Sequence, residues 1–469
     1  MRRKVVLIEL NEVPWRVIER YAQMRPTSAL KRVLQQSRSF TTHAPDHQLS
    51  PWTTWSSVHR GVSDQQHGIA DFGQELASVN ERFPTLWKLG ADAGLCVGNC
   101  GSLHTYPLPE YVASCAFWIP DVFAPRHDSK PDEAQIFQEI NLKMSRESAR
   151  NVSRRIPAGL AARLLLSAPK LGITSRTVSR VMAQLAAELA KPTIKSRRRT
   201  FQSIIAFDVF MRQLERKSPD FCSFFTNHVA SAMHRYWAAA FPEDYPENRY
   251  ASEWRNAFAG EIDWAMDAFD HMLRRLVRFV ERDPDYSIWI ASSMGQAAVD
   301  SSQIKRQVLI ADVGRFMSAL GFAPHEWERR PAMEPRVILK VSGRRTRDFA
   351  ELAGSVHIVG KHSIACTDVG DGVFRLHPGV IQDASEEFCI LDNRRVPFAE
   401  LGFANVAIED EAGQSAYHVP EGSLVIYSST AVSGTQPREQ VSTLEIAPAI
   451  LRTLGVVAPR YMVDTRIAA

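Results

Sequence analysis

Residues 261–293 read EIDWAMDAFDHMLRRLVRFVERDPDYSIWIASS. Apolar residues recur every three or four positions as far as Val280, which predicts an amphipathic helix. A turn containing Pro284 follows, and the short apolar run from Ile288 to Ala291 predicts a buried strand. A helix that leads directly into a buried strand is the repeating unit of doubly wound α/β sheets.

The same alternation recurs along the chain. KVVLIEL (4–10) predicts a buried strand, and a helix with Pro14 near its first turn follows it. Helix-then-strand patterns also occupy residues 84–101 and 202–228, and a late strand at 422–429 precedes a closing helix at 441–456. We therefore predict an α/β fold with a doubly wound, mostly parallel sheet. Sites in such sheets form at the carboxyl ends of the strands.

Two long segments depart from this alternation. One is helical in pattern and rich in basic residues, and the other mixes short strands with loops. We predict a core of residues 1–110, 205–302 and 415–469, a basic helical insertion at 111–204 and a small α+β cap subdomain at 303–414. Within the core, the aromatic-rich residues 235–260 are expected to form a loop.

The net charge of +4 is unevenly distributed. Residues 143–200 contain 14 Lys and Arg against two acidic residues, whereas the rest of the chain has a net charge of −8. A basic helical segment favours an anionic membrane surface or an anionic polymer or lipid-linked substrate, and a solvated insertion is the alternative. Aromatic residues do not alternate with the basic ones, so we expect no nucleic-acid partner.

The N-terminal stretch MRRKVVLIELNEVPW holds only four consecutive apolar residues before Glu9. A secretory signal needs roughly 7–15, and a membrane span needs roughly 18. The six cysteines form no Cys-x-x-Cys pair, which favours reduced structural thiols. We expect a cytoplasmic protein, or one attached peripherally to the inner face of the membrane.

Polar side chains follow the predicted strands where each strand ends. Because the carboxyl ends of parallel strands lie at one edge of a sheet, we expect many of these side chains to share a site. The candidates in chain order are Asn11, Glu12, Asp46, His47, His104, Asn227, His228, His234, Ser293 and Gln296, with His418 preceding the last strand.

Several stretches resemble the alkaline phosphatase superfamily, in particular its type I phosphodiesterase/nucleotide pyrophosphatase branch. SPWTTWSSVHRGVSDQQHGI (50–69) is similar to its nucleophile helix and the loop behind it. HRYW (234–237) and YHVPEGSLVIYSS (417–429) are similar to segments that carry metal-binding histidines. The order and spacing of these motifs support the resemblance, which spans residues 4–110, 205–300 and 415–456.

The resemblance implies two zinc-like metals and a Thr or Ser nucleophile, but most of that set is replaced here. Aspartates of the family correspond to Asn11 and Ala230, an Asp-His pair to Ser293 and Met294, and the nucleophile to Pro51. His234 and His418 remain, and both belong to one metal site. Asn and Met are poor ligands for a zinc-like ion. We expect at most one divalent metal, held by His234 and His418 with His228 as a candidate third ligand, or none.

Several roles stay open at this edge. Thr53 or Thr54 could replace the missing nucleophile, and Glu12 with His228 or His234 could form a metal-free acid/base site. Structural roles compete with these, since Asn11 and Glu12 could cap the following helix. The remaining candidates are expected to bind substrate: Asn11, Asp46, His47, His104, Asn227, Ser293 and Gln296.

LIELNE (7–12) and ASSMGQ (291–296) are also similar to uncharacterised alkaline-phosphatase-like proteins that accompany surface-polysaccharide biosynthesis. Two functions follow as alternatives. The first is a hydrolase or transferase acting on a phosphorylated or otherwise anionic carbohydrate or nucleotide-sugar. The second is a catalytically inactive pseudoenzyme that binds a glycan or anion as a scaffold in envelope polysaccharide biosynthesis.

Overall fold

The computed structural model describes twelve stretches of the chain. They are residues 3–71, 74–146, 158–247, 249–299, 306–330, 332, 335–343, 345–358, 362–379, 387–407, 415–430 and 437–467. The predicted boundaries at 303 and 414, and residues 147–157 of the basic segment, lie outside them.

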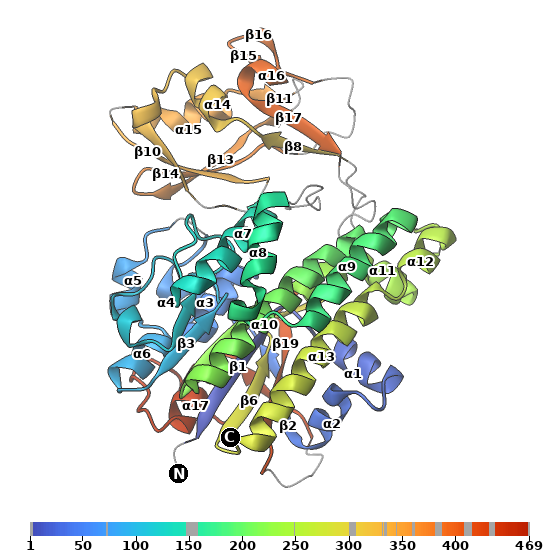
Figure 1. Cartoon of the computed structure of the whole chain (residues 1–469). Helices are drawn as coiled ribbons and strands as arrows, with labels where there is room; N and C mark the ends of the chain where they lie inside the picture. Colours follow the sequence, from blue (N-terminus) through green and yellow to red (C-terminus); the bar gives the residue numbers. More distant parts are fainter. Residues whose placement is uncertain are drawn as a thin grey trace.

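An eight-stranded sheet forms the centre of the molecule (Figure 1). Its order is β20 (Glu439–Ser442), β2 (Ser37–His43), β19 (Glu421–Ser428), β6 (Tyr286–Ala291), β1 (Lys4–Leu10), β5 (Phe221–Thr226), β3 (Val97–Cys100) and β4 (Phe117–Ile119). Only β19 runs antiparallel to its neighbours, and the other pairs are parallel. This topology confirms the predicted α/β fold with a mostly parallel sheet.

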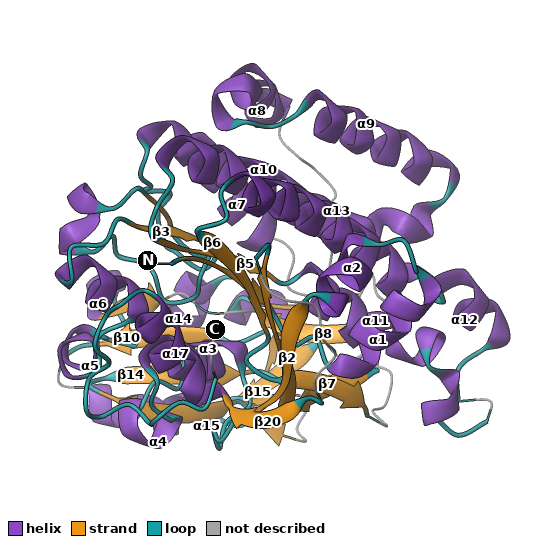
Figure 2. Ribbon diagram, turned by 90° about the horizontal axis from the view of Figure 1, so that it is seen from below, coloured by secondary structure: helices purple, strands orange, loops and turns teal. Residues whose placement is uncertain are grey.

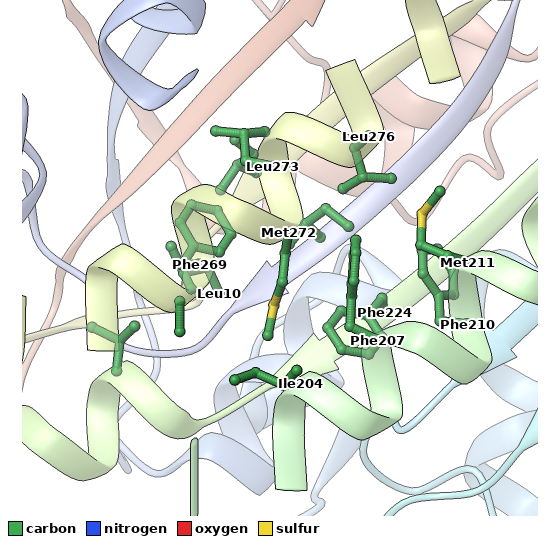
Figure 3. Packing of buried hydrophobic residues seen from close by; sticks show 14 of the residues in the cluster. Leu10, Ile204, Phe207, Phe210, Met211, Phe224, Phe269, Met272, Leu273 and Leu276 are labelled. Atoms are coloured by element: carbon green, nitrogen blue, oxygen red, sulfur yellow. The ribbon is translucent and has the colours of Figure 1, made fainter. Parts of the chain in front are cut away.

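Helices cover both faces of the sheet (Figure 2). Successive side chains of a strand point to opposite faces. On β1, Val6 and Ile8 belong to a core with α10 (Arg198–Lys217) and α13 (Glu261–Arg282), where Phe207, Phe224, Phe269 and Met272 pack together (Figure 3). Val5 and Leu7 belong to the opposite core, with α3 (Pro51–Arg60), α6 (Leu86–Asp92) and α17 (Ile446–Thr453).

The remaining helices of the core and insertion complete these layers. They are α1 (Trp15–Met24), α2 (Ala29–Gln35), α4 (Asp64–His67), α5 (Ala77–Arg82), α7 (Gln135–Arg146), α8 (Ala158–Leu171), α9 (Ser175–Ala190), α11 (His228–Ala240) and α12 (Ser252–Phe258). The helices α8 and α9 lie outermost, beyond α7 and α10 (Figure 2). None of the helices in the described ranges has the length and apolarity needed to cross a membrane.

Several elements differ from the predicted division of the chain. β4 lies inside the segment assigned to the insertion, yet it pairs with β3 at the edge of the central sheet. The helix α10 begins at Arg198, before the predicted boundary at 205. The expected loop at 235–260 is wrong, since it contains the end of α11 and all of α12. Its rings pack instead of facing solvent, with Tyr236 stacked on Phe258.

The segment between β7 (Gly295–Ala298) and β18 (Ala416–Val419) has a hydrophobic core of its own, which runs from Val308 to Phe403. Its helices are α14 (Val313–Ala319), α15 (Phe349–Gly354) and α16 (Phe398–Leu401). Its strands are β8 (Arg306–Ile310), β9 (Trp327–Arg330), β10 (Val337–Val341), β11 (His357–Ile358), β12 (His362–Ser363), β13 (Ala365–Gly370), β14 (Val373–His377), β15 (Phe388–Leu391), β16 (Arg394–Pro397) and β17 (Phe403–Ala407). This subdomain lies above the carboxyl ends of the central strands (Figure 1).

Two contacts at this edge of the sheet matter for the site. Arg375 of β14 reaches the core, where its Nε lies 2.5 Å from Oδ2 of Asp71. β7 pairs antiparallel with β18, and this register places Gln296 opposite His418. The carboxyl edge is therefore bordered by the cap subdomain and by a two-stranded ribbon.

Candidate functional site

Glu12, His234 and His418 converge at the carboxyl edge of the sheet. Glu12 follows β1, His234 lies on α11, and His418 lies on β18. One carboxylate oxygen of Glu12, Oε2, lies 3.0 Å from Nε2 of His234 and 3.4 Å from Nε2 of His418. The three ligand atoms all lie within 4.8 Å of one another, the one such group found among the described residues. Two of these residues were predicted as metal ligands, and the third was predicted as an acid/base catalyst.

The backbone at Glu12 is unusual. Its φ is 61°, in the left-handed region that costs a residue with a side chain about 1–3 kcal/mol. Asn11 holds the turn, since its backbone N–H donates to the carbonyl of Thr226 at 3.1 Å. Neither residue caps the next helix, because α1 begins at Trp15 and has Pro14 as its N-cap. The turn therefore serves to aim the Glu12 carboxylate.

Asn11 fixes the carboxylate from the side opposite the histidines. Its Nδ2 donates to Oε1 of Glu12 and to Oδ1 of Asn227, both at 2.7 Å. Its Oδ1 accepts from the indole N–H of Trp55 at 2.8 Å. Gln296 also donates to Glu12, through Nε2 to Oε2, and to the carbonyl of Ala230 at 3.2 Å. Of the residues predicted to bind substrate, Asn11 and Gln296 thus contact Glu12 directly, and Asn227 contacts Asn11.

The hydrogen bonds of the two histidines determine their tautomers. Nδ1 of His234 lies 2.8 Å from the carbonyl of Ala416, and Nδ1 of His418 lies 2.7 Å from the carbonyl of Leu49. A carbonyl oxygen only accepts, so each Nδ1 carries a proton. Each Nε2 of a neutral ring would then point a lone pair at the Glu12 carboxylate. A proton or a cation must lie between them.

The electrostatics agree with this arrangement. Burial alone would raise the pKa of Glu12, but the imidazoles of His418 and His234 outweigh it and hold that pKa well below its usual range. Burial would likewise lower the pKa of His418, but the Glu12 carboxylate outweighs it and raises that pKa. Without a cation, the site therefore favours a carboxylate beside a protonated imidazole.

The three side chains fit a single zinc-like ion. Two ligands that each lie about 2.0–2.1 Å from a tetrahedral zinc are about 3.3 Å apart. The separations of 3.0 and 3.4 Å between Glu12 and the histidines match that spacing. Backbone carbonyls at both Nδ1 atoms supply the orienting hydrogen bonds that metal-bound histidines commonly have. Two histidines and one glutamate, with a fourth position open, form a known catalytic zinc set.

The neighbouring threonines and serines are buried. The hydroxyl of Thr54 lies 3.1 Å from the carbonyl of Ser50, to which it donates, and 2.8 Å from the hydroxyl of Ser293. The hydroxyl of Thr53 is buried and has no partner among the described residues. Ser293 therefore contacts the start of α3, and Met294 is fully buried in the core.

Two predicted histidines lie apart from the group of three. Both ring nitrogens of His228 are occupied, Nδ1 by the hydroxyl of Thr226 at 2.7 Å and Nε2 by the carbonyl of Ala265 at 3.1 Å. Burial lowers the pKa of His228 to about 4, so its ring stays neutral. His228 is therefore not positioned as a metal ligand, and Glu12 occupies the place of the third ligand. His104 contacts the carbonyl of Trp52 at 2.9 Å.

Asp46 and His47 organise the loop that follows β2. Asp46 accepts hydrogen bonds from the hydroxyl of Ser57 at 2.6 Å and from the backbone N–H of Asp64 at 2.9 Å. The same Ser57 hydroxyl lies 2.9 Å from Nε2 of His67. His47 is exposed, and its Nε2 lies 3.0 Å from the side chain of Gln65. These contacts give both residues a structural role in attaching the loop to α3 and α4.

A cavity of about 530 Å³ lies next to the site. Its wall includes Asn227 and His228, and it extends to α7, α10 and the cap strand β9. Among the residues that the structure describes, Arg199, Arg329 and Arg330 line the cavity, and no acidic residue does. The sequence alone did not predict that these three arginines lie together. Arg199 belongs to the conspicuous run KSRRRT, but no pattern links Arg329 and Arg330 to it.

No protein-family model and no curated protein matches the chain. Solved structures do match along nearly its whole length. An inactive variant of murine ectonucleotide pyrophosphatase/phosphodiesterase 5 in complex with AMP is 10% identical, covering 97% of this chain and 96% of that one, with a TM-score of 0.42. Phosphonoacetate hydrolase from Sinorhizobium meliloti 1021 in complex with phosphonoformate is 13% identical, with coverages of 97% and 96% and a TM-score of 0.41. Wild-type alkaline phosphatase PafA is 12% identical, with coverages of 100% and 98% and a TM-score of 0.47.

All three TM-scores lie below 0.5, so these likenesses are weak. At such identities a likeness concerns the course of the chain alone and assigns no role to a side chain. The function has to follow from the residues at the carboxyl edge.

Proposed function

We propose that the protein is a metal-dependent hydrolase or transferase of phosphorylated, anionic substrates, and that Glu12, His234 and His418 hold one divalent, zinc-like ion. The observation that carries this proposal is the carboxylate oxygen that lies 3.0 and 3.4 Å from two Nε2 atoms, in rings whose Nδ1 atoms donate to backbone carbonyls. A single cation satisfies all three groups at once. A metal-free site would instead keep a proton between Glu12 and an imidazole.

The ligands are held by neighbouring groups. Asn11 and Gln296 donate to the two oxygens of Glu12, while the carbonyls of Leu49 and Ala416 keep both Nδ1 atoms protonated. When bound, the ion would polarise a phosphoryl oxygen as a Lewis acid. The described part of the chain shows no ligand set for a second metal: the Ser293 hydroxyl is hydrogen-bonded with that of Thr54, and Met294 is buried in the core.

The cavity supports an anionic substrate with an apolar or ring-bearing part. Its three arginines bring positive charge to the wall, although Arg330 also forms an ion pair with Glu328 at 3.2 Å, and a guanidinium matches the geometry of a phosphate. Phe123, Phe137 and Phe224 contribute apolar wall, and the amides of Asn141 and Gln202 add polar groups that suit hydroxyls. Phosphorylated carbohydrates and nucleotide-sugars combine these features, and we propose that class of substrate.

Asn227 connects the cavity to the proposed metal ligands. Its side chain lines the cavity and also accepts a hydrogen bond from Asn11, which in turn donates to Glu12. A phosphate held near Asn227 would therefore lie next to the proposed metal position. Of the two candidate nucleophiles, Thr53 is favoured over Thr54, because the Thr54 hydroxyl is already engaged by Ser50 and Ser293.

A panel of phosphomonoesters, phosphodiesters, sugar phosphates and nucleotide-sugars tests the proposal. The full chain loaded with zinc should turn over at least one member. His234→Ala and Glu12→Gln should each lower kcat/KM by about a hundredfold or more, since each removes one of only three ligands. His271→Ala, on the exposed side of α13, is the matched control and should leave activity unchanged.

A folded, zinc-loaded protein that turns over no member of the panel would contradict the catalytic proposal. If that protein still bound a phosphorylated sugar, the alternative of an inactive scaffold would replace it. Turnover that persists unchanged in His234→Ala would instead contradict the assigned site.

A further inference from the structure

The outer faces of α8 and α9 are apolar where surface helices are normally polar. Eight large apolar side chains are exposed in the described part of the chain, and four of them lie on these two helices. They are Leu165 and Leu166 on α8, 52% and 83% exposed, and Met182 and Leu189 on α9, 58% and 88% exposed. Such a concentration marks an interaction surface.

Helical geometry gathers these residues into stripes. On α9, Met182, Ala186 and Leu189 follow one another at spacings of four and three, so they lie along one side of the helix. Ala183, Ala187 and Ala190 are also exposed beside them. The helix has one acidic residue, Glu188, which is buried and paired with Arg198. The outer side of α9 is therefore almost free of charge.

A basic edge borders both stripes. On α8, Leu165 and Leu166 lie near Arg163 and Lys170; Arg163 also pairs with Glu139 of α7 at 3.2 Å, and the described residues of α8 include no acidic side chain. On α9, Arg176 lies on the exposed side, and Lys191 follows the last turn. We call the exposed side chains of α8 and α9, with these basic residues, the α8–α9 face. It forms the outermost layer on that side of the molecule (Figure 2).

We propose that the α8–α9 face binds the surface of a membrane that contains anionic phospholipid. Exposed leucine and methionine beside lysine and arginine is the composition of helices that lie in the plane of a lipid interface. The apolar stripe would enter the headgroup region, while the basic edge would contact lipid phosphates. A second copy of the chain is disfavoured as the occupant, because it would bring two basic edges together.

The proposal does not depend on the metal site. Co-sedimentation of the full chain with vesicles tests it directly, using phosphatidylcholine alone and an equimolar mixture of phosphatidylglycerol and phosphatidylcholine. Wild-type protein should bind the mixed vesicles at least about tenfold more tightly than the neutral ones, and added salt should weaken the binding.

Paired variants separate the two parts of the face. The first double variant, Leu166→Glu with Leu189→Glu, removes apolar contact with the lipid. The second, Lys170→Glu with Lys191→Glu, reverses the charge of the basic edge. Each should lower the affinity for the mixed vesicles by about tenfold or more. Val457→Glu changes a residue that is 91% exposed after α17, outside this face, and should bind as wild type does. Because all these positions are exposed, thermal unfolding should confirm that each variant is folded.

Three outcomes would overturn the proposal. The first is wild-type binding that is no tighter to anionic than to neutral vesicles. The second is binding that the paired variants leave unchanged. The third is a stable dimer in size-exclusion chromatography that Leu166→Glu with Leu189→Glu dissolves, which would assign the face to a contact between copies.

Discussion

Glu12 supplies the carboxylate that lies beside His234 and His418. The aspartate that the family resemblance places on α11 corresponds to Ala230, which offers no side-chain ligand. Gln296 donates both to the carbonyl of Ala230 and to Glu12, and the left-handed backbone of Glu12 directs its carboxylate to the two histidines. The carboxylate of the site thus comes from β1 instead of α11.

Asp46 gives the clearest expected dependence of stability on pH. Burial raises its pKa to about 6 from the ordinary value of 3.8, although hydrogen bonds from Ser57 and Asp64 act against the rise. The folded state therefore holds this proton more tightly than the unfolded chain does. This group consequently lowers the free energy of unfolding as the pH rises from about 4 to about 6.

The variant Asp46→Asn removes that titration. Between about pH 3.5 and about pH 7, its stability relative to wild type should rise by roughly 2–3 kcal/mol. Urea unfolding at a series of pH values measures this difference. Val457→Ala, at an exposed position without a titratable group, should give a curve parallel to that of wild type. Parallel curves for Asp46→Asn and wild type would show that Asp46 does not titrate in this range.

The sequence predicted that His234 and His418 share a site, and the structure brings their rings to 5.4 Å from each other. The sequence also offered His228 as a third ligand, and helical phase explains why the structure does not bring it there. Residues six apart on a helix point about 120° apart, so His228 and His234 of α11 cannot face the same site. The role of Glu12 depends on a backbone conformation that residue type does not disclose.

At the scale of elements, the ribbon of β7 and β18 requires Gly295. A Cβ atom built there would lie 2.1 Å from the backbone carbonyl oxygen of Glu421, which cannot move without shifting β19. Gly295→Ala should therefore destabilise the protein by about 2–4 kcal/mol and weaken metal retention, because Gln296 and His418 sit on this ribbon.

Thermal unfolding and bound-zinc analysis together measure both effects. Gly354→Ala, in the last turn of α15, is the matched control, since a Cβ there meets nothing within 4 Å, and it should not destabilise the protein. A Gly295→Ala protein as stable as wild type would show that the ribbon is free to move away from β19.

Strongly periodic elements were predictable, and irregular ones were not. The stretch 261–293 gave α13 and β6 because its helical spacing and its apolar run are both unambiguous. The three-residue strand β4 carries too short a pattern to be recognised. The aromatic-rich residues 235–260 do not form the predicted loop, because Tyr236 of α11 stacks on Phe258 of α12.

At the scale of the whole molecule, the arginine-lined cavity unites the core, the basic insertion and the cap subdomain. Arg329 and Arg330 come from β9 of the cap, whereas Arg199 comes from α10. If this cavity holds the anionic part of the substrate, Arg329→Ala with Arg330→Ala should raise KM by about tenfold or more and change kcat less.

Steady-state kinetics with the best substrate of the panel measures this effect. Arg347→Ala, on an exposed cap residue outside the cavity, should leave both constants unchanged. A double variant with unaltered KM would exclude the cavity as the substrate site. It would leave the metal proposal untouched.

Assembly over long sequence distances explains what the chain alone could not provide. Glu12 meets His234 across 222 positions, and His418 donates to Leu49 across 369. The sequence shows Glu12, His234 and His418 as polar residues that follow or precede predicted strands. Which side chains contact one another depends on strand register and backbone direction. The sheet edge was therefore predictable as the place of the site, and its connections were not.

Zinc content of the purified full chain tests the central claim most directly. After zinc loading and removal of free metal, wild type and His271→Ala should each hold about one zinc per chain. The three ligand variants should hold little or none: Glu12→Gln, His234→Ala and His418→Ala. Folded His228→Asn should keep its zinc. Two zincs per chain, no zinc in folded wild type, or zinc retained by all three ligand variants would contradict the account.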